Sequence, residues 1–260
     1  MAVSDDVLER AQRGDRAACA ALLAESYPSV VRMARALTGD SAEAERVVDF
    51  VLTHGARFLP SWQRGSTPQN WFYHHTLLAA RDRAAGAPRL GSVQARSAPG
   101  PRADLLVAEA QGAGPEYVAF VRAIRQLPAQ QCEAFILHQG ERLDARLLGI
   151  AMDCSSAAAE NHLNAASATL AAIAGSSLGS CRSALSRAYA ALGPPAEAVG
   201  PAVTPYARSY TRPLRLRRLV RRVILVAVLI ALGWAAWHWW QELWVWAGPW
   251  ARRLREKSGF

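Results

Sequence analysis

The sequence predicts an all-α protein: two small helical domains joined by a linker, followed by one C-terminal transmembrane helix. Three observations lead to this prediction. Apolar residues recur at helical spacing, start and stop signals bound each segment, and no β-type alternation of useful length occurs. In addition, 51% of the residues are apolar, which is enough to build helical cores.

The first helical domain is predicted over residues 1–86. The expected helices begin near Asp5, Pro28, Ser41 and Asn70. Gly39 ends the second of them, because glycine readily adopts the left-handed conformation that closes a helix. The segment 65–68 (GSTP) breaks the chain before the fourth helix.

Residues 87–114 are rich in Gly, Pro, Ala and Ser, and they predict a flexible linker in which 103–110 could form a helical turn. A second domain follows over 115–175. Its expected helices are 116–126, 128–138, 144–151 and 155–173. The short turn between the last two predicts a helix-turn-helix, with Ser155 or Ser156 as the N-cap of the final helix.

The remainder of the chain divides into four segments. Residues 176–212 predict a flexible linker with a short helix over 181–192, and residues 213–222 predict a basic juxtamembrane segment. A transmembrane helix over 223–246 and a basic tail over 247–260 complete the prediction. The breakers 193–195 (GPP) and 200–201 (GP) are the reason for the flexible assignment.

The apolar run 223–240 is the strongest membrane signal. Its 18 residues contain one polar side chain, His238, and seven tryptophans crowd the run's distal half and the residues after it, where an aromatic belt would lie. A buried or interfacial helix is the alternative. Residues 182–222 carry nine arginines and one acid, so we expect a single-pass protein of the cytoplasmic membrane with its N-terminal domains in the cytoplasm.

The net charge of +9 invites a nucleic-acid-binding function, but its distribution opposes this interpretation. The 35 residues from 147 to 181 contain no lysine or arginine, and they cover most of the helix-turn-helix, including all of its second helix. The only formal charge on its second helix is Glu160. A DNA-reading helix is normally flanked by cations that neutralise phosphates, whereas here the positive excess belongs to the membrane flank.

Several segments carry a resemblance to a known family. They are 8–18 (LERAQRGDRAA), 36–40 (ALTGD), 44–48 (AERVV), 71–73 (WFY) and 127–137 (LPAQQCEAFIL). In order and spacing they resemble region 2 and the start of region 4 of the extracytoplasmic-function (ECF) sigma factors of the sigma-70 family. The resemblance covers about half of the chain.

The resemblance implies a region 2-like bundle, a region 4-like helix-turn-helix and a set of binding residues. Those implied to bind core RNA polymerase are Glu45, Val48 and Asp49. Those implied to bind promoter DNA are Trp71, Tyr73, Arg81 and Arg83 in the first domain, and Ser156, Asn161, His162 and Asn164 in the second. Arg81 and Arg83 could instead lie on a solvated helix face.

The sequence also departs from the family pattern. Arg46 stands where the clamp-binding helix usually has aspartate, and Asp49-Phe50 replaces the usual glutamine-glutamate pair. In the second domain, positions that are typically basic are Glu160, His162, Ala165 and Ser167. Each missing cation removes about one phosphate contact.

Two functions are therefore predicted as alternatives. The first is a membrane-tethered ECF-type sigma factor that binds core RNA polymerase and directs promoter recognition and transcription initiation, released by proteolysis within 175–212. The second is a degenerate, membrane-anchored sigma-like module that no longer binds DNA and serves a protein partner, such as an anti-sigma-like regulator. In both, the C-terminal helix contacts membrane lipid.

No enzyme activity, cofactor or metal is predicted. His74, His75 and His162 lack a carboxylate or cysteine at the spacing that metal sites on helices use. The four cysteines are scattered, which does not suggest a disulfide framework.

Overall fold

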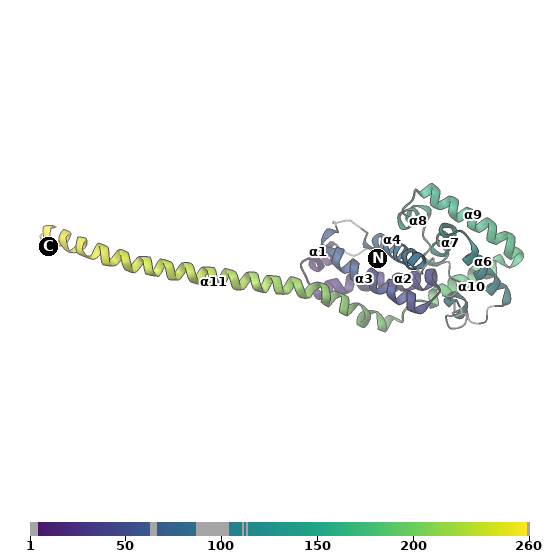
Figure 1. The fold of residues 1–260 in the computed structure, drawn as a ribbon, viewed down its shortest axis with the longest axis horizontal. Coiled ribbons are helices and arrows are strands. Elements are labelled where there is room, and N and C mark those ends of the chain that lie inside the picture. The colour runs from purple at the N-terminus through teal and green to yellow at the C-terminus, as the bar shows by residue number, and fades with distance from the viewer. Residues whose placement is uncertain (1–4, 63–66, 87–103, 111, 113, 259–260) are drawn as a thin grey trace. The chain divides into compact units, whose positions relative to one another are not determined.

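The computed structural model describes residues 5–62, 67–86, 104–110, 112 and 114–258, and these form helices and short connections without a strand (Figure 1). The all-α prediction is confirmed. The α-helices are α1 (Asp5–Gln12), α2 (Arg16–Thr38), α3 (Ser41–Phe58), α4 (Pro68–Gly86), α5 (Leu105–Ala108), α6 (Pro115–Gln126), α7 (Ala129–Glu141), α8 (Ala145–Met152), α9 (Ser156–Ala174), α10 (Leu178–Ala191) and α11 (Ala196–Ser258).

Aspartate side chains begin the long helices of the first block. Asp15 accepts hydrogen bonds from the backbone N–H groups at the start of α2, and Asp40 does the same for α3. Gly39 ends α2 in the left-handed conformation, with φ of 67°, as the sequence predicts. This close cap lets α3 turn back and pack against α2.

Pro28 lies inside α2, so the prediction that a helix begins there is wrong. Proline can hold a helical φ, and its cost is the intrahelical hydrogen bond that its missing N–H cannot make. Buried residues on both sides of it, including Leu23 and Val30, pack the helix into the core and offset that cost. Tertiary packing therefore carries α2 through the proline.

The second block has the predicted helices, with bounds within about three residues of those expected. Ser155 is the N-cap of α9, its hydroxyl accepting a hydrogen bond from the N–H of Ala158 at 3.2 Å. Asp153 closes α8 with a left-handed φ of 56°. Gly149 allows the tight turn, since a Cβ there would lie 2.8 Å from the carbonyl oxygen of Cys154.

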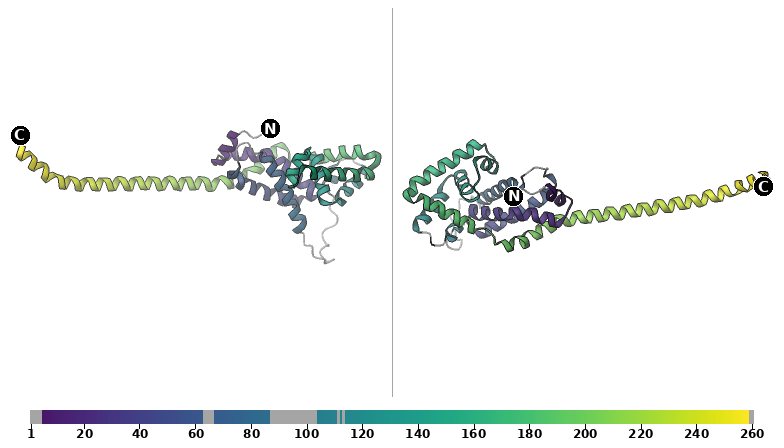
Figure 2. Two further views of the ribbon diagram at one scale, coloured as in Figure 1. Left: turned by 90° about the horizontal axis from the view of Figure 1, so that it is seen from above. Right: turned by 180° about the vertical axis from the view of Figure 1, so that it is seen from behind.

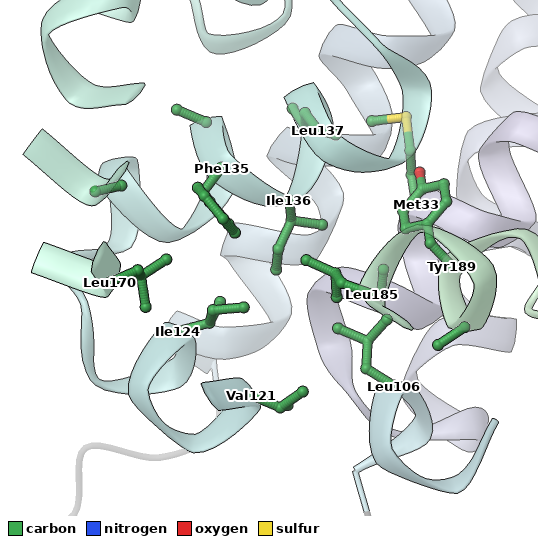
Figure 3. Packing of buried hydrophobic residues seen from close by; sticks show 14 of the residues in the cluster. Met33, Leu106, Val121, Ile124, Phe135, Ile136, Leu137, Leu170, Leu185 and Tyr189 are labelled. Carbon is green, nitrogen blue, oxygen red and sulfur yellow. The ribbon is translucent and has the colours of Figure 1, made fainter. Parts of the chain in front are cut away.

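The two predicted domains share one core within a compact unit that extends from Met1 to Tyr210. Met33 and Leu77 of the first block belong to the same buried cluster as Phe120 and Phe135 of the second. Figure 3 shows labelled members of this cluster converging from α2, α5, α6, α7, α9 and α10. The arrangement differs from the expectation of two domains separated by a flexible linker.

Helix α10 explains much of this difference. The short helix predicted over 181–192 is confirmed as α10, and Leu185 and Tyr189 bury it in the shared core. The first turns of α11 make most of the rest of 176–212 helical as well. The predicted break at Gly193–Pro195 is confirmed, since it separates α10 from α11. The second breaker, Gly200-Pro201, does not interrupt α11. Residues 87–103 of the other predicted linker lie outside the described residues.

The second unit, Thr211–Phe260, contains the continuation of α11, which is one unbroken helix in both views of Figure 2. Of the described helices, only α11 contains a stretch long and apolar enough to cross a membrane. This stretch is Leu219–Trp240, whose 22 residues have a mean hydropathy of 2.1 and no buried side chain. It overlaps the predicted transmembrane helix, 223–246.

Candidate functional site

Helix α3 presents the residues expected to bind polymerase. Glu45 and Asp49 are exposed and one helical turn apart, while Val48 is half-buried between them and the core. Positions i and i+4 lie on one face of a helix, so the two carboxylates project together. They line an open cavity of about 650 Å³, whose other lining residues are Ala42, Arg46, Phe50, Thr53, His54 and Arg57.

The α3 face combines mixed charge with exposed aromatic side chains. Arg46 forms an ion pair with Glu43, so part of its charge is neutralised within the helix. Phe50 is 41% exposed and stacks on His54 with ring centroids 3.9 Å apart. Exposed aromatics beside charges of both signs are typical of a surface that binds protein rather than phosphate.

Asp49 already has a partner within the chain. Its Oδ1 accepts a hydrogen bond from the hydroxyl of Tyr206 at 3.0 Å. Burial, with the Asp49 carboxylate as a further cause, raises the pKa of Tyr206 to about 12. The first turns of α11 therefore lie against α3 at the predicted binding face.

Trp71 lies in an aromatic cluster at the junction of α3 and α4. Its ring centroid is 3.9 Å from that of His75 and 5.7 Å from that of Phe58. Gly55 of α3 permits this packing, because a Cβ there would lie 2.7 Å from Phe72 and 3.1 Å from Trp71. Trp71 is half-buried and holds α3 and α4 together, and its indole Nε1 has no hydrogen-bond partner among the described residues.

His75 is the titratable member of this cluster. Burial, followed by the neighbouring charges of His74 and His54, lowers its pKa below the ordinary value of 6.5. The neutral ring is therefore the form that the folded protein favours.

The other expected DNA-binding residues of α4 face the second block. Arg81 donates two hydrogen bonds to the carboxylate of Glu133 on α7, at 2.8 and 2.6 Å. The Nδ1 of His74 lies 3.2 Å from the carbonyl oxygen of Ala151 on α8. Tyr73 is half-buried and packs against the shared core, and this burial raises the pKa of its hydroxyl. Pairing with Glu133 neutralises the charge of Arg81 and occupies its Nε and Nη2 donors, which weakens it as a phosphate ligand.

Arg83 lies within α4, but its side chain is outside the described part of the structure. In this arrangement, therefore, Tyr73, His74 and Arg81 of α4 contact the second block and remain partly exposed.

Helix α9 carries the four residues expected to read DNA in the second block. Ser156, Asn161 and Asn164 are exposed, whereas His162 is half-buried. They are available for contact, but no lysine or arginine lies on α9, and Glu160 is exposed among them. A duplex approaching this helix would meet a negative charge and no cation on α9 itself.

Sequence reasoning missed a set of arginine contacts that join the two blocks. Arg32 of α2 pairs with Glu141 of α7 at 2.8 Å, and Glu141 also accepts hydrogen bonds from Ser29 and Tyr189. Arg125 of α6 pairs with Asp104 at 2.7 Å and donates to a carbonyl oxygen near the end of α2. These arginines are used inside the protein.

One signal for these contacts is visible in the sequence. Glu133 stands in the apolar run 132–137 (CEAFIL), and a carboxylate in such a run requires a buried partner. The identity of that partner, 52 positions away at Arg81, has no local signature.

Within the described residues, no group of three or more His, Cys, Asp or Glu side chains is placed to hold a metal ion. All four cysteines are free, and burial raises the pKa of the Cys19 thiol to about 12, which makes it unreactive.

No protein-family model and no curated protein matches this sequence. Among solved structures, the chain is similar to the co-crystal structure of the sigma factor RpoE in complex with the anti-sigma factor NepR from Bartonella quintana. The two share 19% identity over 59% of this chain and 94% of that chain, with a TM-score of 0.44. The similarity is distant.

Proposed function

We propose that this protein is a membrane-anchored, sigma-related interaction module that binds a protein partner through α3 and does not read DNA. The observation that carries this proposal is the bidentate pair between Arg81 and Glu133, which uses the principal phosphate-binding candidate of α4 inside the protein. The absence of any cation on α9 supports the same conclusion.

The interface between the two blocks also favours a permanently closed unit. It buries large apolar side chains, among them Met33 and Phe120, together with carboxylates that are paired to arginines. Opening such an interface would expose apolar surface and leave buried charges without partners, both of which cost free energy. The contacts of α4 with the second block are therefore expected to persist.

The partner is of protein character, and core RNA polymerase is the first candidate. The basis is the resemblance of 44–48 to a clamp-binding helix and the exposure of Glu45 and Asp49. An anti-sigma-like regulator is another partner that the same face could bind.

The anchor is Leu219–Trp240, which we propose crosses the cytoplasmic membrane once. Exposed arginines lie at the N-terminal end of the apolar stretch: Arg212 precedes it, and Arg221 and Arg222 are in its first turn. The excess of cations on that side orients Met1–Tyr210 toward the cytoplasm.

The test uses the full chain in lipid nanodiscs with core RNA polymerase that lacks a sigma subunit. Co-purification is expected, together with no initiation on promoter templates. Glu45→Arg with Asp49→Arg should abolish binding, whereas Glu109→Arg with Glu116→Arg, a matched charge change at exposed positions elsewhere, should leave it unchanged.

A sigma factor that opens to initiate transcription is the second candidate, favoured by the exposed α3 carboxylates. Transcription initiation by the full chain at any template, together with its loss in the Trp71→Ala variant, would establish the sigma-factor function. The same result would overturn the proposal of a closed interaction module. Failure of polymerase to bind at all would remove polymerase as the partner.

A further inference from the structure

The first turns of α11 are an ordered part of the compact unit. Val203 and Ala207 are fully buried, and Tyr210 is 9% exposed, although residues at the intervening positions, such as Arg208 and Ser209, are exposed. Burial at 203, 207 and 210 follows the spacing of one helical face. The segment Ala196–Tyr210, called the α11 base from here on, is therefore seated through one apolar stripe.

The site where the α11 base meets α3 is Asp49. The hydroxyl of Tyr206 donates to its carboxylate at 3.0 Å, and Tyr206 also lies close enough to Tyr27 of α2 for its pKa to be affected. The first turns of α11 run beside α2 and α3 in Figure 1 and in the rear view of Figure 2. One of the two exposed carboxylates of the α3 face is thus already bonded from within the chain.

We infer that the α11 base is a partial intramolecular cover for the partner-binding face of α3, engaging that face at Asp49, so that seating of the base and binding of the partner compete for this carboxylate. This inference rests on the proposed function, in which α3 is the docking helix. The cover and the anchor belong to the same helix, α11.

Chain length strengthens the competition. Leu219, the first residue of the apolar stretch, follows Tyr206 by thirteen positions. Even a fully extended chain of that length reaches only ~45 Å. A large partner that docks at Asp49 must therefore share the space beside the bilayer with the anchor, whatever conformation the intervening residues adopt.

The experiment compares full-length chains in nanodiscs and measures two quantities. Hydrogen exchange of the amides of 196–210 reports whether the base is seated, and the affinity for core RNA polymerase reports whether α3 is accessible. Ala207→Glu places a charge in the buried stripe and should unseat the base. Ser209→Glu adds the same charge at an exposed position of the same turn and is the control.

We expect Ala207→Glu to increase exchange across 196–210 and to tighten polymerase binding about tenfold, with Ser209→Glu unchanged in both. Tyr206→Phe removes only the hydroxyl that reaches Asp49 and should tighten binding about threefold, so the result does not depend on a variant that could disturb folding.

Three outcomes would overturn the inference. Equal polymerase affinity of the wild-type and unseated chains would show that the cover does not compete, with the proposed function intact. Unchanged exchange in Ala207→Glu would show that the base is not held by its buried stripe. An unseated base with no polymerase binding in any variant would reject the proposed function, and the competition would fall with it.

Discussion

Arg81 of α4 and Glu133 of α7 form a bidentate ion pair, with the carboxylate side chain only 9% exposed. Removing the cation alone would leave a buried charge without compensation, which costs about 3 kcal/mol. Arg81→Ala is therefore expected to lower the free energy of unfolding by that amount, while the double variant Arg81→Met and Glu133→Met should recover most of it.

Urea unfolding of the full chain in detergent, followed by labelling of the buried Cys181 thiol, measures this change. The control is Arg13→Ala, which removes an exposed pair with Glu9 and should cost below about 1 kcal/mol. Equal losses from Arg81→Ala and Arg13→Ala would contradict the closed interface.

Two helical glycines predict opposite effects of the same substitution. A Cβ at Gly140 would lie 2.5 Å from the ring of Tyr189, which is fully buried, whereas nothing lies within 4 Å of a Cβ at Gly179. Gly140→Ala should destabilise the protein by about 1–3 kcal/mol through overpacking. Gly179→Ala should stabilise it by about 0.5–1 kcal/mol, because alanine loses less backbone entropy in a helix.

The same thiol-labelling measurement distinguishes the two glycine variants. A neutral result for Gly140→Ala would mean that α7 and α10 are not held at the described distance.

His75 predicts a pH dependence with a definite sign. Its pKa is lowered in the folded state by burial and by His74 and His54, so the unfolded chain binds the proton more tightly. The contribution of His75 to stability is therefore complete above about pH 6.5, the pKa of the unfolded chain. It is lost as the pH falls from that value toward the lower pKa of the folded state.

The unfolding free energy of the wild type should therefore decrease more between pH 7.5 and 5.5 than that of His75→Gln. His162→Gln, outside the cluster, controls for the removal of a histidine. If the unfolding free energies of the wild type and of His75→Gln change in parallel with pH, His75 is not the source of the pH dependence.

Helix α9 lacks cations, so adding them should create DNA affinity. Glu160→Arg with Ala165→Arg changes two exposed positions of this helix. Two further phosphate contacts should make the salt dependence of log K steeper by about 1.8 and tighten non-specific binding at least about tenfold at low salt.

Fluorescence anisotropy with duplex DNA measures this gain. Glu116→Arg with Ala119→Arg makes the same charge change on exposed positions of α6 and is the control. If the α9 and α6 double variants gain the same affinity for DNA, the shape of α9 contributes nothing to DNA binding beyond the added charge.

Leu219–Trp240 should anchor the protein in the bilayer. An arginine at the centre of a membrane helix costs about 2.5–3.5 kcal/mol, so Leu229→Arg with Ile230→Arg should shift the chain out of the carbonate-resistant membrane fraction. Ala172→Arg, at an exposed position of α9, should not. Retention of the double variant in that fraction would indicate attachment by another part of the chain.

Local signals account for most of the helices. Gly39, Ser41 and Ser155 mark helix ends where the structure has them, because capping depends on residues within one turn. Local signals failed at Pro28, where packing maintains the helix through the proline, and at Gly200-Pro201, which α11 passes through without a break.

Placement of the site was predictable only where it depends on one helix. Glu45 and Asp49 share a face because their spacing requires it. The pairing of Arg81 with Glu133 depends on how two distant helices meet, and no window of sequence contains that information. The sequence alone therefore allows Arg81 to be a phosphate contact or part of a solvated helix face, and does not indicate its pairing with Glu133.

The shared core has a consequence for how this protein can change over time. Two separate domains can accumulate substitutions independently, but here Met33 and Leu77 of one block are packed with Phe120 and Phe135 of the other. A substitution in either block alters the other, so homologues that keep this closed unit should exchange Arg81 and Glu133 together rather than singly.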